Sequence, residues 1–137
     1  MSNRVVTCLL INCERKLLIL KRSDKVRTYK GKWGGVAGYV EDNERPVDTA
    51  FKEIREETGF ESQIISLLME EEPIEFTDIY NDIKIDWIVY PFLFKIEKNG
   101  KVQIDWEHSE YRWIEPPQIT KFDTVPHLKE IVFKMLG

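Results

Sequence analysis

Apolar residues repeat with two different periods along this chain, and the periods predict its helices and strands. One set has the i, i+3, i+4, i+7 spacing of an amphipathic helix over residues 46–58: Val47, Ala50, Phe51 and Ile54. Pro46 suits the first helical position, and Gly59 suits a left-handed C-terminal cap. A similar spacing after Pro126 predicts a closing helix.

Runs of β-branched and aromatic residues predict strands between and around these helices. They lie at residues 4–12, 16–21, 33–40, 62–76, 83–98 and 111–114. In the fifth run the apolar positions alternate from Ile83 and then change phase across Pro91, which indicates a bulge or bend. Asn99 and Gly100 are a two-residue hairpin signal. Strands interrupted by one helix and followed by another predict an α/β sandwich.

Composition narrows the class of protein. A chain of 137 residues with 42% hydrophobic content fits one folded domain over residues 1–137. Its net charge of −4 argues against a general nucleic-acid-binding surface. Cys8 and Cys13 are too few for a disulfide framework or a thiolate metal site, and we expect both to pack as small hydrophobes. With no signal-peptide pattern and no membrane-length apolar run, a cytoplasmic location and no membrane partner are expected.

The first predicted helix concentrates acid on one side. Glu53, Glu56 and Glu57 fall within an arc of about 100°, beside the apolar stripe. Carboxylates crowded on one helix face repel each other, and a divalent cation would relieve the repulsion. Oxygen ligands favour Mg²⁺ or Mn²⁺. The pattern therefore indicates a metal-dependent enzyme acting on phosphates, and the plainer interpretation is a solvated helix face.

The stretch over residues 38–60 resembles the Nudix box. Eight residues fall on the pattern of that box in fixed register: Gly38, Glu44, Glu53, Ile54, Glu56, Glu57, Gly59 and Phe60. Lys52 departs from the pattern, because the family has Arg at that place. The resemblance implies the Nudix fold, an α/β/α sandwich with a mixed β-sheet in which the box forms a loop–helix–loop.

The resemblance also implies roles for the matched residues. Glu56 and Glu57 would be the main ligands of Mg²⁺, for which Mn²⁺ can substitute. Glu53 would be a metal ligand or a base that orients water, and the carbonyl group of Gly38 would be a further ligand. Family members often take another carboxylate from a loop across the cleft. Glu107 is the favoured candidate here and Glu110 the second, with an ordinary solvated loop acid as the alternative.

Glu44 looks like the supporting acid of the family, paired with the basic residue at position 52. A guanidinium group holds two carboxylates through a rigid fork, whereas an ammonium group is a flexible point charge. We therefore expect Lys52 to keep the electrostatic role and to position Glu44 and Glu53 more loosely.

A basic stretch precedes the box. Residues 21–33 contain six Lys or Arg residues and one acid, in a chain that is acidic overall. Beside a metal cleft such a loop could attract a polyphosphate, and a solvated loop is the alternative. Arg22, Arg27 and Lys32 are the candidate phosphate-binding residues, and Tyr29 or Trp33 could stack a base.

Together, the box and the basic stretch imply a Mg²⁺-dependent hydrolase that cleaves a diphosphate bond by water attack on phosphorus. The favoured substrate is a nucleoside diphosphate linked to another group, such as ADP-ribose or a nucleotide sugar. A nucleoside triphosphate is the alternative, and a nucleotide-binding module with weak catalysis is a further one because of Lys52. The expected partner is a small-molecule nucleotide, and the resemblance leaves a homodimer open.

Overall fold

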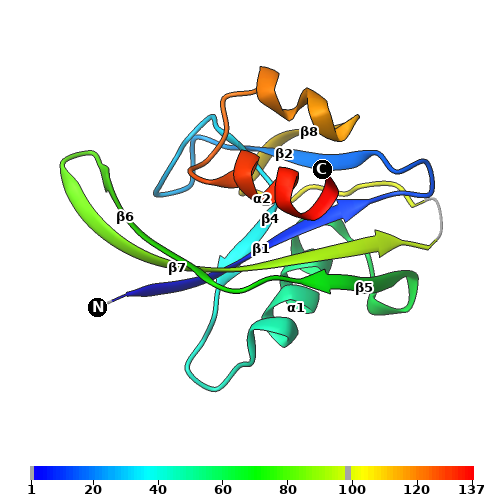
Figure 1. Ribbon diagram of the computed structural model, residues 1–137, viewed down its shortest axis with the longest axis horizontal. Helices are drawn as coiled ribbons and strands as arrows, with labels where there is room; N and C mark the ends of the chain where they lie inside the picture. Colours follow the sequence, from blue (N-terminus) through cyan, green and yellow to red (C-terminus); the bar gives the residue numbers. More distant parts are fainter. Residues whose placement is uncertain (1, 98–99) are drawn as a thin grey trace.

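The computed structural model describes residues 2–97 and 100–137 and shows a mixed sheet with a helix on each side (Figure 1). Its elements, in chain order, are β1 (Asn3–Ile11), β2 (Leu17–Arg22), β3 (Trp33–Gly34), β4 (Val36–Tyr39), α1 (Pro46–Thr58), β5 (Ile65–Glu70), β6 (Ile74–Tyr80), β7 (Ile83–Ile96), β8 (His108–Ile114) and α2 (Leu128–Leu136). Two 3₁₀ helices, η1 (Ser62–Ile64) and η2 (Pro116–Lys121), complete the described elements. The predicted α/β sandwich and the predicted bounds of α1 are confirmed.

The parallel pair β1 and β7 forms the centre of the sheet. The pairing runs from Asn3 opposite Trp87 to Ile11 opposite Lys95. β1 also pairs antiparallel with β4 and, at its end, with β2, which in turn pairs with β3 and β8. The other edge of β7 pairs antiparallel with β5 and β6. The β6–β7 hairpin extends away from the centre of the sheet (Figure 1).

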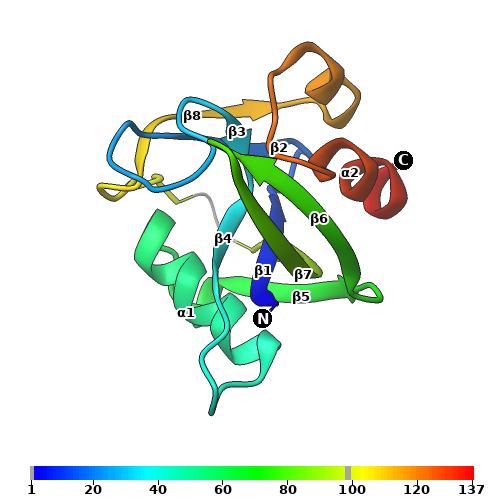
Figure 2. The same ribbon diagram turned by 90° about the vertical axis from the view of Figure 1, so that its left-hand side faces the viewer.

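Each face of the sheet has its own apolar core, and the two helices cover opposite faces (Figure 2). The core beneath α1 includes Ala50 and Ile54 of the helix, packed with Phe94 of β7. The core beneath α2 includes Ile131 and Val132 of that helix. The apolar faces predicted for both helices are therefore the buried ones.

β7 runs through Pro91 without interruption, so the predicted bulge is not at that residue. Val89 and Leu93 belong to the core beneath α2, whereas Phe92 and Phe94 belong to the core beneath α1. The change in apolar phase therefore arises because the middle of β7 is buried on both faces. A bulge occurs instead in the neighbouring strand β5, between Leu67 and Met69.

The single strand predicted over residues 33–40 is two short strands. β3 pairs with β2, and β4 pairs with β1. Between them, the backbone at Gly35 approaches β1 so closely that a Cβ atom would lie 2.7 Å from the carbonyl oxygen of Cys8. The glycine lets the chain pass from one pairing partner to the next, and β4 then brings Gly38 alongside α1.

The expectations for the two cysteines and for the predicted hairpin are met only in part. Cys8 is buried as expected, but Cys13 is exposed because it lies in the turn between β1 and β2. The hairpin predicted at Asn99 and Gly100 falls partly outside the described residues, and Val102, just after it, is buried but does not lie in a strand. Within the described part of the chain, no helix has the length and apolar character needed to cross a membrane.

Replacing Ile54 tests the contact between α1 and the sheet. Its side chain is fully buried, so we expect Ile54→Ala to lower the free energy of unfolding by about 2–5 kcal/mol. Arg55→Ala, at the next and exposed position, should change it by less than about 0.5 kcal/mol. Urea denaturation followed by circular dichroism measures both, and equal losses in the two variants would contradict this account of the core.

Candidate active site

A cavity of about 770 Å³ opens beside α1, between the helix, the β2–β3 connection and the β6–β7 hairpin. Its lining contains three kinds of functional side chain. They are the acids Glu41, Glu53, Glu56 and Glu107, the bases Arg22, Lys25, Arg27 and Lys52, and aromatic residues that include Tyr29, Tyr39 and Trp87. Acids and bases thus share one cavity. Three of the four bases come from the β2–β3 region, and the fourth, Lys52, lies on α1 beside Glu53 and Glu56.

The acids of α1 lie against β4. Glu57 is only 1% exposed; its Oε1 accepts a hydrogen bond from the Ala37 N–H at 3.3 Å, and its Oε2 has no partner among the described residues. Glu53 is half-buried, and its carboxyl group occupies the space that a Cβ atom at Gly38 would fill. Glu56 is exposed at the cavity. Glycine at position 38 therefore allows the helix acids to approach the strand backbone.

Burial and mutual repulsion raise the pKa of these acids. Burial raises the pKa of Glu53 to about 7, and the nearby charge of Glu56 adds to the rise. Burial raises the pKa of Glu57 well above its ordinary value, and Glu53 and Glu107 contribute further. Burial also raises the pKa of Glu107, together with the charge of Asp105. The cluster lacks enough positive charge to keep all of its members ionised near neutral pH.

This set of donors fits a hard divalent cation. Mg²⁺ and Mn²⁺ bind carboxylate and carbonyl oxygens, and a cation would supply both the missing charge and a partner for the Oε2 atom of Glu57. Within residues 2–97 and 100–137, no three His, Cys, Asp or Glu side chains are already arranged to hold a metal ion. We therefore expect Glu53 and Glu56 to change side-chain conformation when a cation binds.

Glu44 and Lys52 form the pair that the sequence predicts. The Lys52 Nζ donates to Glu44 Oε2 at 2.8 Å, while Glu44 Oε1 accepts from the Thr49 hydroxyl at 3.0 Å and from the Glu41 N–H at 3.1 Å. The Lys52 ammonium group lowers the pKa of Glu44. Lys52 therefore ties the loop before α1 to the helix, and its one charged hydrogen-bond partner among the described residues is Glu44.

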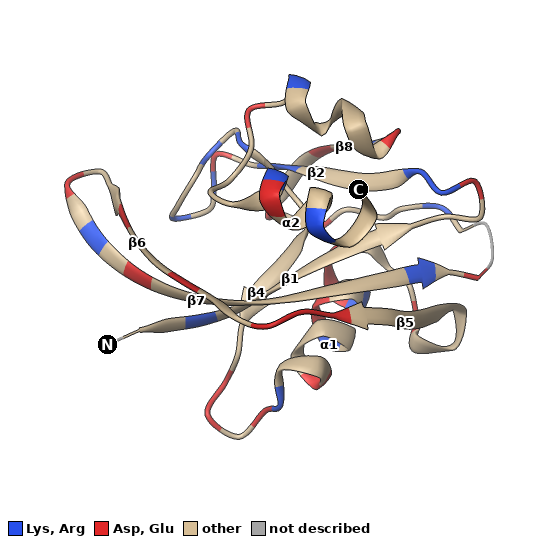
Figure 3. Ribbon diagram, in the orientation of Figure 1, with Lys and Arg blue, Asp and Glu red and all other residues tan. Residues whose placement is uncertain are grey.

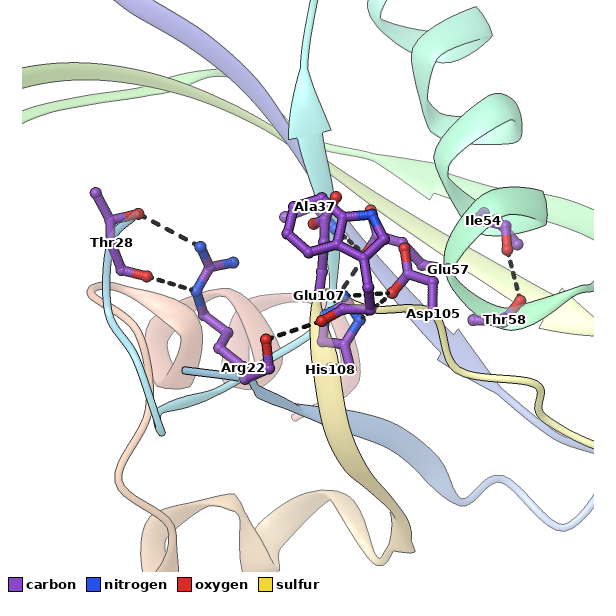
Figure 4. A network of polar contacts seen from close by, with 11 residues as sticks. Arg22, Thr28, Ala37, Ile54, Glu57, Thr58, Asp105, Glu107 and His108 are labelled. Atoms are coloured by element: carbon purple, nitrogen blue, oxygen red, sulfur yellow. Dashed lines mark hydrogen bonds and ion pairs between the residues drawn. The ribbon is translucent and has the colours of Figure 1, made fainter. Parts of the chain in front are cut away.

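A polar network that sequence analysis missed connects Glu57 to the loop across the cavity (Figure 4). The imidazole of His108 is buried, with Nδ1 3.0 Å from Asp105 Oδ1 and Nε2 3.7 Å from Glu57 Oε1. Asp105 also accepts a hydrogen bond from the Glu107 N–H at 3.2 Å. Burial lowers the pKa of His108. The network fixes the turn that carries Glu107 to the cavity, and an aspartate three residues before a histidine was its signal in the sequence.

Part of the basic stretch faces the cavity. Arg22, Lys25 and Arg27 line it, as does the ring of Tyr29. Arg22 also has a structural task, because its Nε donates to the carbonyl group of Thr28 at 2.9 Å.

Lys32 and Trp33 were expected to bind substrate, but the structure does not bring them to the cavity with the other candidate residues. The Nζ of Lys32 lies 2.9 Å from an oxygen of Asp123. Trp33 is buried, with its ring edge-on to Phe122 at 5.4 Å between centroids and the guanidinium group of Arg112 above it at 5.2 Å. Both residues attach the chain at β3 to the C-terminal segment.

Comparisons with known proteins agree with this geometry. The family model of the NUDIX domain matches residues 1–135. Nucleoside triphosphatase NudI of Escherichia coli O139:H28 is 30% identical over 130 residues, which cover 90% of this chain and 89% of that protein.

Among solved structures, the E. coli dihydroneopterin triphosphate pyrophosphohydrolase has a TM-score of 0.81 at 17% identity, with 97% of this chain and 94% of that chain covered. A C. elegans Ap4A hydrolase binary complex has a TM-score of 0.79 at 16% identity, with 98% and 95% covered. The chain therefore belongs to the Nudix family, as a hydrolase of phosphorus-containing anhydrides.

Proposed function

We propose that this hydrolase is Mg²⁺-dependent and cleaves the diphosphate bond of a small nucleotide by water attack on phosphorus. The observation that carries the proposal is the division of charge within one cavity. Glu53 and Glu56 of α1 and Glu107 of the opposite loop lie on the acidic side, and Lys25 and Arg27 lie on the basic side. A diphosphate group between them can contact the lysine and arginine directly and the carboxylates through a divalent cation.

The proposed roles follow from position and burial. Glu56, Glu57 and the Gly38 carbonyl are the proposed metal ligands, and a bound cation would supply charge neutralisation and a more acidic water molecule. Glu53 and Glu107 border the cavity from different segments, so either can accept the proton of the attacking water. Lys25 and Arg27 would bind phosphate oxygens and orient the substrate.

Two substrate classes remain in the proposal. The cavity is of a size usual for ligand sites, about 300–1,000 Å³, and so has room for either class. A nucleoside triphosphate comes first, because NudI is named a nucleoside triphosphatase and four Lys or Arg residues line the cavity. A nucleoside diphosphate joined to another group, such as ADP-ribose, comes second and rests on the sequence expectation. Cleavage would release a nucleoside monophosphate with pyrophosphate in the first case and with a phosphorylated group in the second.

A hydrolysis screen with Mg²⁺ tests the activity. It should include nucleoside triphosphates, ADP-ribose, nucleotide sugars and dinucleoside polyphosphates. A pyrophosphatase or phosphatase added to the assay converts the products to inorganic phosphate, which is then measured. We expect Glu56→Gln to lower kcat at least about 100-fold, because it removes a charged oxygen from the metal-binding set. Glu61→Gln, an exposed acid just after α1, is the matched control and should keep full activity. Absence of turnover with either Mg²⁺ or Mn²⁺ would favour the binding-module alternative.

Restoring the family residue at position 52 tests the role of Lys52. An arginine can reach Glu44 and a second carboxylate together, so Lys52→Arg should raise kcat about two- to tenfold while KM stays nearly constant. Steady-state kinetics on the substrate found in the screen gives both constants. An unchanged or lower kcat would show that looser positioning by lysine does not limit the rate.

The stability of the protein should depend on pH and Mg²⁺ together. The pKa of Glu53 is raised to about 7 and that of Glu57 is raised as well, so the folded state favours their protonated forms. This contribution to stability is fully present below the unfolded pKa near 4.5 and is lost as pH rises through the folded pKa. Mg²⁺ needs the ionised forms, so it should raise the Tm by several degrees more at pH 8 than at pH 5.5.

Thermal scans in EDTA and in MgCl₂ measure this effect. Glu57→Gln should flatten the pH dependence seen in EDTA and reduce the Mg²⁺-induced shift, because it removes the buried ionisable group. Shifts of the same size at pH 5.5 and pH 8 in the wild-type protein would contradict the assignment of the cation to these carboxylates.

A further inference from the structure

The segment over residues 23–32, called here the strap, forms one side of the cavity and carries Lys25 and Arg27. Its two ends are tied together at β2. The Arg22 carbonyl accepts a hydrogen bond from the Gly31 N–H at 2.9 Å, and the Ser23 hydroxyl donates to the Trp106 carbonyl at 2.9 Å. These contacts fix the base of the strap, and its later residues, Tyr29 and Lys30, contact the β6–β7 hairpin (Figure 2).

Tyr29 attaches the strap to that hairpin. Its hydroxyl donates to Asp78 Oδ2 at 2.6 Å, across 49 positions of sequence. Its ring lies 4.9 Å from the ring of Tyr80 and 6.3 Å from the ring of Trp87, measured between centroids. Burial and the contact with Asp78 raise the pKa of Tyr29, so the hydroxyl keeps the proton that it donates.

Two unfavourable local features meet in this contact. The φ angle of Tyr29 is +53°, a left-handed conformation that a bulky residue keeps only where its surroundings impose it. Asp78 is half-buried on the inner face of β6, where its neighbours two positions away are Phe76 and Tyr80. A carboxylate on such an aromatic face needs a hydrogen-bond partner. The strap supplies that partner, and the hairpin in turn supplies the contacts that hold Tyr29.

The charges of Lys25 and Arg27 in the strap are free to face a ligand. Among the described residues, neither Lys25 nor Arg27 forms an ion pair. Figure 3 shows Lys and Arg gathered in the strap, and Asp and Glu along β6 and the connection that precedes it. Because an unattached strap could turn its cations toward solvent or toward these acids, the direction they face depends on how the strap is held.

We propose that Tyr29 is a positioning residue, whose hydrogen bond to Asp78 holds the strap so that Lys25 and Arg27 face the phosphates of a bound nucleotide. The ligand named here rests on the proposed function. The observed ring and hydrogen-bond contacts of Tyr29 are to the hairpin and not to the carboxylates of α1. The contact therefore governs substrate binding and leaves the chemical step unchanged.

Steady-state kinetics separates an effect on substrate binding from an effect on the chemical step. Tyr29→Phe removes the hydroxyl and should raise KM about tenfold, the effect of losing one hydrogen bond to a charged group, with kcat within about twofold of wild type. Asp78→Asn keeps an oxygen acceptor and should retain a KM close to that of wild type. Thr77→Val is the matched control, because it removes a hydrogen bond of equal length, 2.6 Å to Asp86, from the exposed side of the same strand. It should change neither constant.

Limited proteolysis with trypsin measures how firmly the strap is held, and it needs no nucleotide. The strap offers cleavage sites at Lys25, Arg27 and Lys30, whose access depends on how firmly the segment is held. Tyr29→Phe should be cut within the strap several times faster than wild type, with the sites identified by mass spectrometry. Asp78→Ala removes the same hydrogen bond from the hairpin side and should give the same change, so the test stays decisive if Tyr29→Phe folds poorly.

Faster cleavage within the strap together with a raised KM and an unchanged kcat would support the proposal. Equal cleavage rates in wild type and both variants would overturn it, as would a KM that does not change. If the wild-type protein hydrolyses no nucleotide, the proposed function fails. The role of Tyr29 in holding the strap is then decided by the cleavage rates alone.

Discussion

Burial of the Glu57 carboxyl group between α1 and β4 is the constraint on which this site depends. One oxygen accepts a backbone hydrogen bond and the other has no partner within the part of the chain that the structure describes, so the folded protein carries an unfavourable buried group beside the cavity acids. Apolar contacts of Ala50 and Ile54 with the sheet offset this cost on the same helix. A helix less well packed could relieve the carboxylate by moving outward, and the acids would then lose their alignment with the strand.

The backbone of β4 must come close to α1 for the same reason. Gly38 leaves room for the carboxyl group of Glu53, and Gly35 lets the chain reach this position by passing close to β1. A side chain at Gly38 would displace Glu53, while one at Gly35 would push β4 away from β1. The geometry of the acidic cluster thus depends on strand pairing as much as on the helix that carries the acids.

Features set by neighbours in sequence could be predicted, and features set by distant contacts could not. The bounds of α1 follow from Pro46, the apolar spacing and Gly59, and the Glu44–Lys52 contact joins residues only eight apart. The roles of Lys32 and Trp33 depend on Asp123 and Phe122, which β3 meets only in the folded chain. Likewise, the fold alone brings Glu57 to His108, so the periodicity of α1 could not reveal the network that supports Glu107.

The two tasks of the site, cation binding and nucleotide binding, depend on contacts of different range along the sequence. The acids that would hold the cation are arranged by one helix and one adjoining strand, so a short stretch of sequence defines the reaction class. Lys25, Arg27 and Tyr29 come from the strap and Trp87 comes from the β6–β7 hairpin. The mutual position of these two segments depends on contacts such as that between Tyr29 and Asp78. Substitutions in the hairpin can therefore alter how a nucleotide is held without disturbing the acids of α1. The identity of the substrate is consequently encoded in tertiary contacts, which is why the sequence pattern identifies the chemistry more firmly than the nucleotide.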